Sequence, residues 1–379
     1  MSIETSGRRG MGRREALRRL GAAGLGLAAA GRATGSGVFA EPAAAAPLGA
    51  AQTAAFPEGA VIRTILRDMA PAELAHGSVL FHEHLSLGLA FWDQMLPNIA
   101  DAQREAFIGP ADEPYFMQDT GMMVAELRAA LSEGVSALVD GGHADMGRDL
   151  AFLRSVSEQS GMPIVASGGY YIDPFYPDEV RNGTDDEIAE SLAAAAVAER
   201  WGAFGEIGSS AEITTDERKM MRAVGKAHLA TNLPIFTHTA NGLEAVTQLD
   251  ILESVGVSPD RVVIGHMGGL EDPEAEVHRA IAARGAYVGF DRLGGGPEAD
   301  GHKVPMVQAM LDAGQAERVL LASDFARASD TQLRGGAGYA KTITQFVPML
   351  REAGVDDATI HTLTIDNPLR FMAFVPHDA

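Results

Sequence analysis

The chain of 379 residues has 30 Lys and Arg against 51 Asp and Glu, a formal net charge of −21. Its first forty residues hold seven Arg and two Glu, a net charge of +5, and subtracting this from −21 leaves −26 for the remainder. Such an acidic body repels nucleic acid and anionic membrane surfaces and suits a small neutral substrate. The absence of cysteine excludes disulfides and thiolate metal ligands.

The first forty residues predict an export signal. Arg13 and Arg14 precede a weakly apolar run, residues 22–30, and a small-residue cleavage pattern ends at Ala40. This order resembles a twin-arginine signal peptide, and the run is too short to span a membrane. The alternative is a disordered basic arm. Residues 41–60, rich in Ala and Pro, are predicted to be a linker before a single domain at residues 61–379, which would work in the periplasm or outside the cell.

From residue 61 onward, short runs rich in Val, Ile and Ala alternate with amphipathic helices. Eight runs are predicted strands: residues 78–85, 135–142, 163–171, 203–210, 234–240, 261–269, 286–293 and 318–325. Helices between them include residues 146–159, 185–200, 216–230, 243–255, 273–283 and 304–313. This alternation predicts an α/β fold, a single-domain (β/α)8 TIM barrel with the helices outside. The alternative is a doubly wound open sheet, but no Gly-rich dinucleotide motif follows the first strand. Residues 93–118 are predicted to be an insertion near the barrel mouth.

Polar residues stand at the carboxyl ends of five predicted strands. They are His82 and His84 on the first strand, Glu206 on the fourth, His238 on the fifth, His266 on the sixth and Asp324 on the eighth. Residues two apart in a strand share a face, and the carboxyl ends of barrel strands meet where active sites are built. One such residue could be a satisfied core group, and the histidine pair could face solvent. Six at corresponding strand ends indicate a metal site.

These residues resemble the ligand set of the phosphotriesterase family in the amidohydrolase superfamily, over residues 61–374. The resemblance implies a (β/α)8 barrel that holds two divalent metal ions, usually zinc. It implies that His82, His84 and Asp324 bind the more buried ion, and that His238 and His266 bind the more exposed ion. Cobalt and manganese also suit imidazole and carboxylate ligands.

A residue on the fourth strand bridges the two ions in this family, and in many members it is a carbamylated lysine. The four lysines of this chain lie outside the predicted strands, whereas the fourth strand offers Glu206. The sequence therefore resembles the glutamate-bridged branch of the family.

The predicted chemistry is hydrolysis. A water shared by two such ions loses a proton near neutral pH, because bound zinc lowers the pKa of water to about 7. The hydroxide would attack an ester bond, most readily in a lactone or a carboxylic ester, and Asp324 would act as both ligand and general base. A phosphotriester or an amide is the alternative substrate. A non-catalytic metal- or ligand-binding protein is the alternative class, although the intact ligand set disfavours it.

Two further residues are predicted to contact the substrate. Tyr171 follows the third strand and would lean over the metals, unless it is an ordinary packing residue. Arg292 follows the seventh strand in an Asp-Arg pair that resembles one in lactonase-like members of the family, where the arginine lines the pocket. The alternative is that Arg292 forms a salt bridge with Asp291 or another nearby acid and does not contact the substrate. His143, after the second strand, is predicted to lie behind the ligands, and the resemblance also implies a homodimer.

Overall fold

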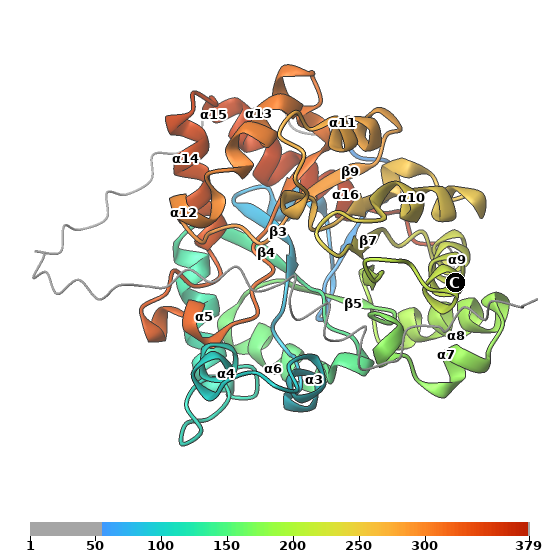
Figure 1. Cartoon of the computed structure of the whole chain (residues 1–379), viewed down its shortest axis with the longest axis horizontal. Helices are drawn as coiled ribbons and strands as arrows, with labels where there is room; N and C mark the ends of the chain where they lie inside the picture. Colours follow the sequence, from blue (N-terminus) through green and yellow to red (C-terminus); the bar gives the residue numbers. More distant parts are fainter. Residues whose placement is uncertain (1–54, 378–379) are drawn as a thin grey trace, which may run out of the picture.

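The computed structural model describes residues 55–377, so the predicted signal and most of the predicted linker lie outside it. Eight parallel strands form one sheet in chain order, with helices around it (Figure 1). They are β3 (Ser78–Glu83), β4 (Val135–Asp140), β5 (Ile164–Gly168), β6 (Ala203–Gly208), β7 (Ile235–His238), β8 (Val262–Ile264), β9 (Tyr287–Phe290) and β10 (Val319–Leu321).

The two ends of this sheet meet beyond β10. The amide of Asp324 donates to the carbonyl of His82 at 3.1 Å, and the amide of His84 donates to the carbonyl of Phe325 at 3.0 Å. The sheet is therefore a nearly closed barrel, which confirms the predicted α/β barrel.

Helices follow most of the strands and cover the barrel. They are α2 (Pro71–Leu74), α3 (Leu89–Met95), α4 (Asp101–Ile108), α5 (Thr120–Ser132), α6 (Leu150–Ser160), α7 (Asp178–Asn182), α8 (Asp185–Ala198), α9 (Thr215–Thr231), α10 (Ala245–Ser254), α11 (Glu276–Ala283), α12 (Pro297–Asp300), α13 (Lys303–Asp312), α14 (Val347–Glu352), α15 (Asp357–His361) and α16 (Asn367–Met372). The six predicted helices correspond to α6, α8, α9, α10, α11 and α13. The predicted insertion contains α4 and the end of α3.

Local sequence explains where two of the longest helices begin. Thr184 accepts a hydrogen bond from the amide of Glu187, whose carboxylate accepts one from the amide of Thr184. Thr214 and Glu217 make the same reciprocal pair before α9. Each pair satisfies amides that the first helical turn leaves without partners. The capping pairs therefore fix the residues at which α8 and α9 begin.

The strands end earlier than predicted, each near the point where polar residues begin. His266 and Asp324, which lie just beyond β8 and β10, have left-handed φ values of 59° and 49°. This conformation cannot continue a strand, so the chain turns out of the sheet there. An apolar run cannot reveal such a turn, which is why the predicted strands are too long.

A short antiparallel pair closes the end of the barrel that lies opposite the strands' carboxyl ends. β1 (Ile62–Arg63) pairs with β2 (Asp68–Met69), and Val61 pairs with Phe374 after α16. Ile62 and Phe371 pack with residues at the centre of the barrel strands. Within residues 55–377, no helix combines the length and the apolar character needed to cross a membrane.

Candidate metal centre

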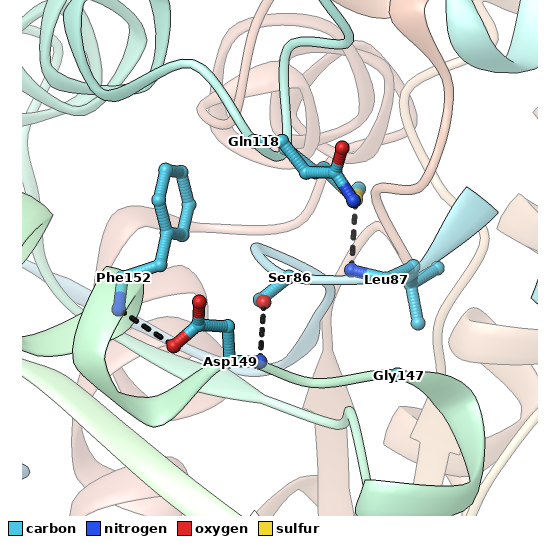
Figure 2. Close-up of a pocket in the computed structure, with 7 residues that line it drawn as sticks. Ser86, Leu87, Gln118, Gly147, Asp149 and Phe152 are labelled. Carbon is cyan, nitrogen blue, oxygen red and sulfur yellow. Dashed lines mark hydrogen bonds between the residues drawn. The ribbon is translucent and has the colours of Figure 1, made fainter.

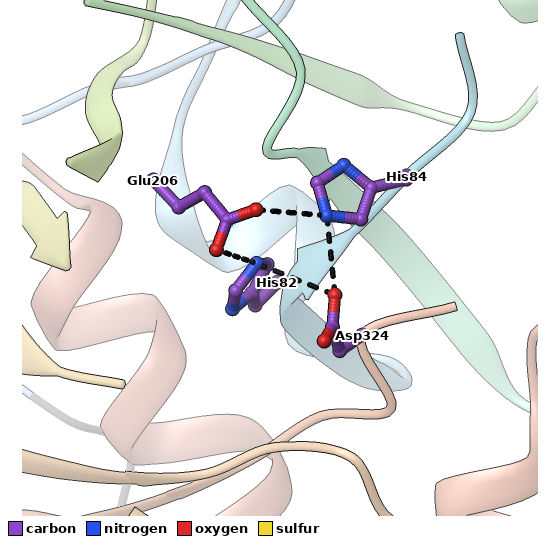
Figure 3. Close-up of side chains that lie close together, drawn as sticks. All are labelled: His82, His84, Glu206 and Asp324. Atoms are coloured by element: carbon purple, nitrogen blue, oxygen red, sulfur yellow. Dashed lines mark ion pairs between the residues drawn. The ribbon is translucent and has the colours of Figure 1, made fainter. Parts of the chain in front are cut away.

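Four of the predicted ligands converge at the carboxyl ends of β3, β6 and β10. We call His82, His84, Glu206 and Asp324 the first donor group (Figure 3). Nε2 of His84 lies 3.1 Å from Oε1 of Glu206 and 3.1 Å from Oδ1 of Asp324. Nε2 of His82 lies 3.4 Å from Oε2 of Glu206 and 3.7 Å from Oδ1 of Asp324. The four side chains thus surround one point.

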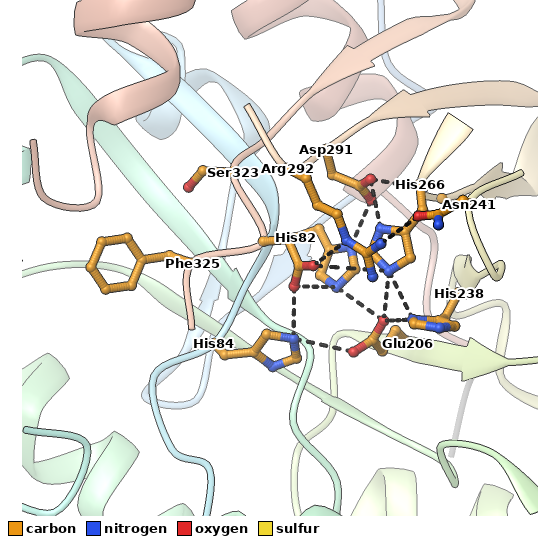
Figure 4. Close-up of polar contacts among 12 residues, drawn as sticks. His82, His84, Glu206, His238, Asn241, His266, Asp291, Arg292, Ser323 and Phe325 are labelled. Carbon is orange, nitrogen blue, oxygen red and sulfur yellow. Dashed lines mark hydrogen bonds and ion pairs between the residues drawn. The ribbon is translucent and has the colours of Figure 1, made fainter. Parts of the chain in front are cut away.

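The other two predicted ligands meet the same glutamate from the opposite side. We call Glu206, His238 and His266 the second donor group (Figure 4). Oε2 of Glu206 lies 2.8 Å from Nδ1 of His238 and 3.3 Å from Nε2 of His266, and these two nitrogens are 2.7 Å apart. Glu206 therefore belongs to both groups, which is the position that the sequence predicts for a bridge.

One carboxylate fixes the histidines from behind. Asp291, which follows β9, lies 2.8 Å from Nδ1 of His82 and 2.7 Å from Nδ1 of His266. Since the charged carboxylate accepts hydrogen bonds, both histidines carry their proton on Nδ1 and present the Nε2 lone pair to the donor groups. Burial disfavours the charge of Asp291, but His266 and His82 outweigh this effect and lower its pKa.

Asp291 also forms a compact set with these two histidines, but its role differs from that of a ligand. His82, His266 and Asp291 offer atoms that are close enough to hold an ion. Both oxygens of Asp291 are already occupied by the Nδ1 groups. Asp291 therefore orients one histidine of each donor group. Sequence analysis missed this role and considered Asp291 only as a partner of Arg292.

The donor atoms fit divalent cations. Nε2 of His82 is buried and has no hydrogen-bond partner among residues 55–377. Its lone pair faces oxygens of Glu206 and Asp324, an arrangement that repels unless positive charge lies between them. Imidazole nitrogen and carboxylate oxygen are the ligands that zinc and its neighbours accept. The residues thus meet the needs of a metal centre.

The electrostatics of the site lead to the same requirement for positive charge. Burial disfavours a proton on His84, but hydrogen bonds to Asp324 and Glu206 outweigh burial and raise the pKa of His84 to about 9. The pKa of His82 is likewise raised well above its usual value, because Glu206 and Asp291 outweigh burial. The first donor group thus draws protons onto its buried imidazoles, and a group that does so favours cations at the same place.

The two predicted substrate contacts lie beside the donors. The hydroxyl of Tyr171 is 3.4 Å from both ring nitrogens of His238, and the tyrosine is buried. Nε of Arg292 donates to Oδ2 of Asp324 at 2.9 Å, and Nη1 donates to Asn241 at 2.9 Å. The acid that pairs with Arg292 is thus the proposed base itself. The Arg292 side chain is 38% exposed, so the site reaches solvent on this side.

His143 is fully buried behind the donors, 3.6 Å from Oδ1 of Asp145. Burial lowers the pKa of His143 to about 3, so this imidazole is neutral.

A separate cavity of about 330 Å³ lies beyond His84, lined by Ser86, Leu87, Met117, Gln118, Gly147, Asp149 and Phe152 (Figure 2). None of the six donor residues lines it. We therefore place the chemistry at the donor groups.

Known proteins share this fold and are similar in sequence over most of the chain. The phosphotriesterase homology protein of Escherichia coli strain K12 is 30% identical over 303 residues, which cover 78% of this chain and 97% of that protein. A crystal structure of the Escherichia coli homology protein, complexed with phosphate in its active site, has a TM-score of 0.68 at 29% identity and covers 79% of this chain and 99% of its own.

More distant relatives differ in their named activities. The N-acetyltaurine hydrolase of Homo sapiens is 24% identical over 345 residues, covering 83% of this chain and 98% of that protein. The crystal structure of a lactonase from Listeria monocytogenes has the same fold, with a TM-score of 0.71 at 24% identity and coverage of 82% and 98%. A model of the phosphotriesterase family matches residues 61–372. The chain therefore belongs to the phosphotriesterase family, whose members are divalent-metal-dependent hydrolases.

Proposed function

We propose that the protein is a binuclear zinc hydrolase that cleaves an ester, with a lactone or a carboxylic ester as its substrate. The observation that carries the proposal is the position of Glu206 in both donor groups, with Oε1 toward His84 and Oε2 toward His238 and His266. Two ions held there would acidify a shared water and polarise the bond under attack.

The protein's own residues have distinct roles in this proposal. Asp291 keeps His82 and His266 in the tautomer that donates from Nε2. Asp324 is the proton acceptor in this proposal, and its carboxylate is ionised, because His84 and the neighbouring cations outweigh burial and keep its pKa well below the usual value. Arg292 holds the second oxygen of Asp324, and because its side chain is 38% exposed, its guanidinium is accessible to a substrate carbonyl that approaches from solvent.

An ester is preferred for two reasons. The acidic chain disfavours an anionic substrate, and the Asp-Arg pair at Asp291 and Arg292 resembles that of lactonase-like family members. An amide is the second candidate, because the relative from Homo sapiens is named for hydrolysis of an N-acetyl compound.

The test is turnover of a substrate panel by zinc-loaded protein. Lactones, aryl esters, organophosphates and N-acyl amides should be compared by kcat/KM. We expect the highest value for a lactone or an aryl ester, and a higher value for an amide or an organophosphate would contradict the ester assignment. Elemental analysis should give about two zinc ions per chain, as expected for a pair of ions sharing one carboxylate. A value near one after careful reconstitution would reject the binuclear site.

We also propose that the protein is exported in folded form through a twin-arginine route. Arg13 and Arg14 support this proposal, and they lie outside the described residues. The double substitution Arg13→Lys, Arg14→Lys should leave the precursor in the cytoplasm. Cell fractionation of the two forms provides the measurement, and unchanged export of the variant would exclude the route.

A further inference from the structure

The glutamate between His82 and His84 faces away from the donor groups. Side chains alternate along a strand, so Glu83 points opposite to His82 and His84. It is fully buried. Its carboxylate accepts hydrogen bonds from the amide of Ser323 at 2.9 Å, the hydroxyl of Ser323 at 2.6 Å and the amide of Phe325 at 2.8 Å. These donors flank Asp324 in the sequence on both sides.

The contacts of Glu83 lie at the seam of the barrel. β3 and β10 are the two ends of the strand order, and the chain beyond β10 meets β3 through two backbone hydrogen bonds, Asp324 to His82 and Phe325 to His84. Glu83 adds three bonds from its side chain to the same stretch. Figure 4 shows Ser323 and Phe325 on that stretch, next to the histidines, and Asp324 lies between these two residues in the sequence.

This arrangement joins the two parts of the first donor group. His82 lies on β3 and His84 directly follows it, whereas Asp324 comes from the opposite side of the seam. Asp324 has a left-handed backbone, with a φ of 49°, a conformation that costs energy in a residue other than glycine. The hydrogen bonds that Glu83 accepts from Ser323 and Phe325 hold the backbone in this state.

We propose that Glu83 is a positioning residue, which locks the backbone at Asp324 so that this carboxylate meets His82 and His84 around one ion. The inference rests on the proposed metal centre. It differs from a general stabilising role, because it predicts weaker metal retention in the first donor group and not merely a less stable barrel.

The chain offers a matched control. Glu126 on α5 is also a buried carboxylate, and it accepts the amides of Gln332 and Leu333, farther along the same connection after β10. Glu126→Gln and Glu83→Gln each replace a carboxyl group with an amide and leave a single acceptor oxygen. Both variants should lower the thermal midpoint of unfolding of the metal-free protein. Only Glu83 holds the residues on either side of a predicted ligand.

The experiment measures zinc retention by full-length protein against a chelator, together with the thermal midpoint. For Glu83→Gln we expect zinc affinity about 10- to 100-fold weaker than in the parent, the usual cost of losing an outer support of a metal ligand. One ion per chain should be lost first. Glu126→Gln should retain zinc as the parent does. Parental retention in Glu83→Gln, or equal loss in both variants, would overturn the proposal.

Ser323→Ala is the second variant, in case Glu83→Gln does not fold. It removes only the hydroxyl bond to Glu83 and should weaken zinc retention in the same direction by a smaller factor, and unchanged retention would overturn the proposal. The zinc measurement needs no substrate. A parent protein that binds two zinc ions but hydrolyses no member of the panel would therefore reject the proposed function, while Glu83→Gln would still decide the role of Glu83.

Discussion

The two donor groups are built with different charge. The first donor group combines His82 and His84 with two carboxylates, Glu206 and Asp324, whereas the second donor group has only Glu206 beside its two histidines. All four histidines are almost completely buried, so burial does not distinguish the groups. If each group binds one ion, as proposed, the charge and the number of donors should set how firmly each group holds it. The first donor group should keep its ion longer.

Asp324→Asn should have the largest effect, because it removes charge and a ligand from the first donor group and also the proposed base. Loss of a general base costs about a hundredfold to ten-thousandfold in turnover, and lost ligation adds to this. Steady-state kinetics together with zinc analysis checks the prediction. Arg292→Gln is the control, since it leaves the carboxylate but removes its ion pair. Near-normal turnover in Asp324→Asn with both ions bound would remove Asp324 from the mechanism.

Glu206→Gln should come next and should sharpen the comparison. A neutral amide bridges two cations poorly, and the second donor group would be left with no carboxylate. We expect the zinc content to fall toward one ion per chain and turnover to fall more than about 100-fold, beyond the cost of an outer support. If Glu206→Gln retained both zinc ions in the presence of a chelator, the shared carboxylate would not determine the difference in zinc affinity between the two donor groups.

Reconstitution tests the same bridge without a mutation. A carbamylated lysine forms from carbon dioxide, whereas Glu206 already carries its carboxylate. The metal-free protein should regain full activity with zinc alone when bicarbonate is excluded. A requirement for bicarbonate, or a carbamate found on a lysine, would mean that the bridge is assigned to the wrong residue.

Asp291→Asn should have a smaller effect than Glu206→Gln, and it should weaken the zinc affinity of both donor groups alike. Asp291 supports His82 in the first donor group and His266 in the second, so both sites should lose zinc affinity together, by about 10- to 100-fold. Chelator titration should show two ions leaving in parallel. Selective loss of one ion would show that Asp291 supports only one group.

Tyr171→Phe should have the smallest effect. Its hydroxyl lies beside His238 of the second donor group at 3.4 Å, too long for a strong hydrogen bond. We expect zinc content to be unchanged and kcat/KM to fall less than about tenfold, since one net hydrogen bond contributes about 0.5–1.5 kcal/mol. Loss of zinc in this variant would mean that the hydroxyl supports His238 directly.

The sequence predicts the barrel because eight apolar runs end in polar residues, and this pattern needs only local information. The six donors follow from the same rule, since parallel strands bring their carboxyl ends together. Asp291 also stands at a strand end, but this rule does not distinguish a metal ligand from a carboxylate that binds the outer nitrogens of two histidines. Glu83 could have been found, since alternation along the strand turns it away from its two neighbours.

The pairing of Val61 with Phe374 determines how the protein could be attached to a surface. Phe56 lines one pocket together with Asp260 and Arg318, which lie just before β8 and β10, so the chain approaches the barrel at the strands' amino ends. The six donors lie at the opposite ends of the strands. A tether joined before Val61 or after Phe374 would therefore hold the barrel by its closed end, and an immobilised enzyme would keep its reactive face open to the surrounding solution.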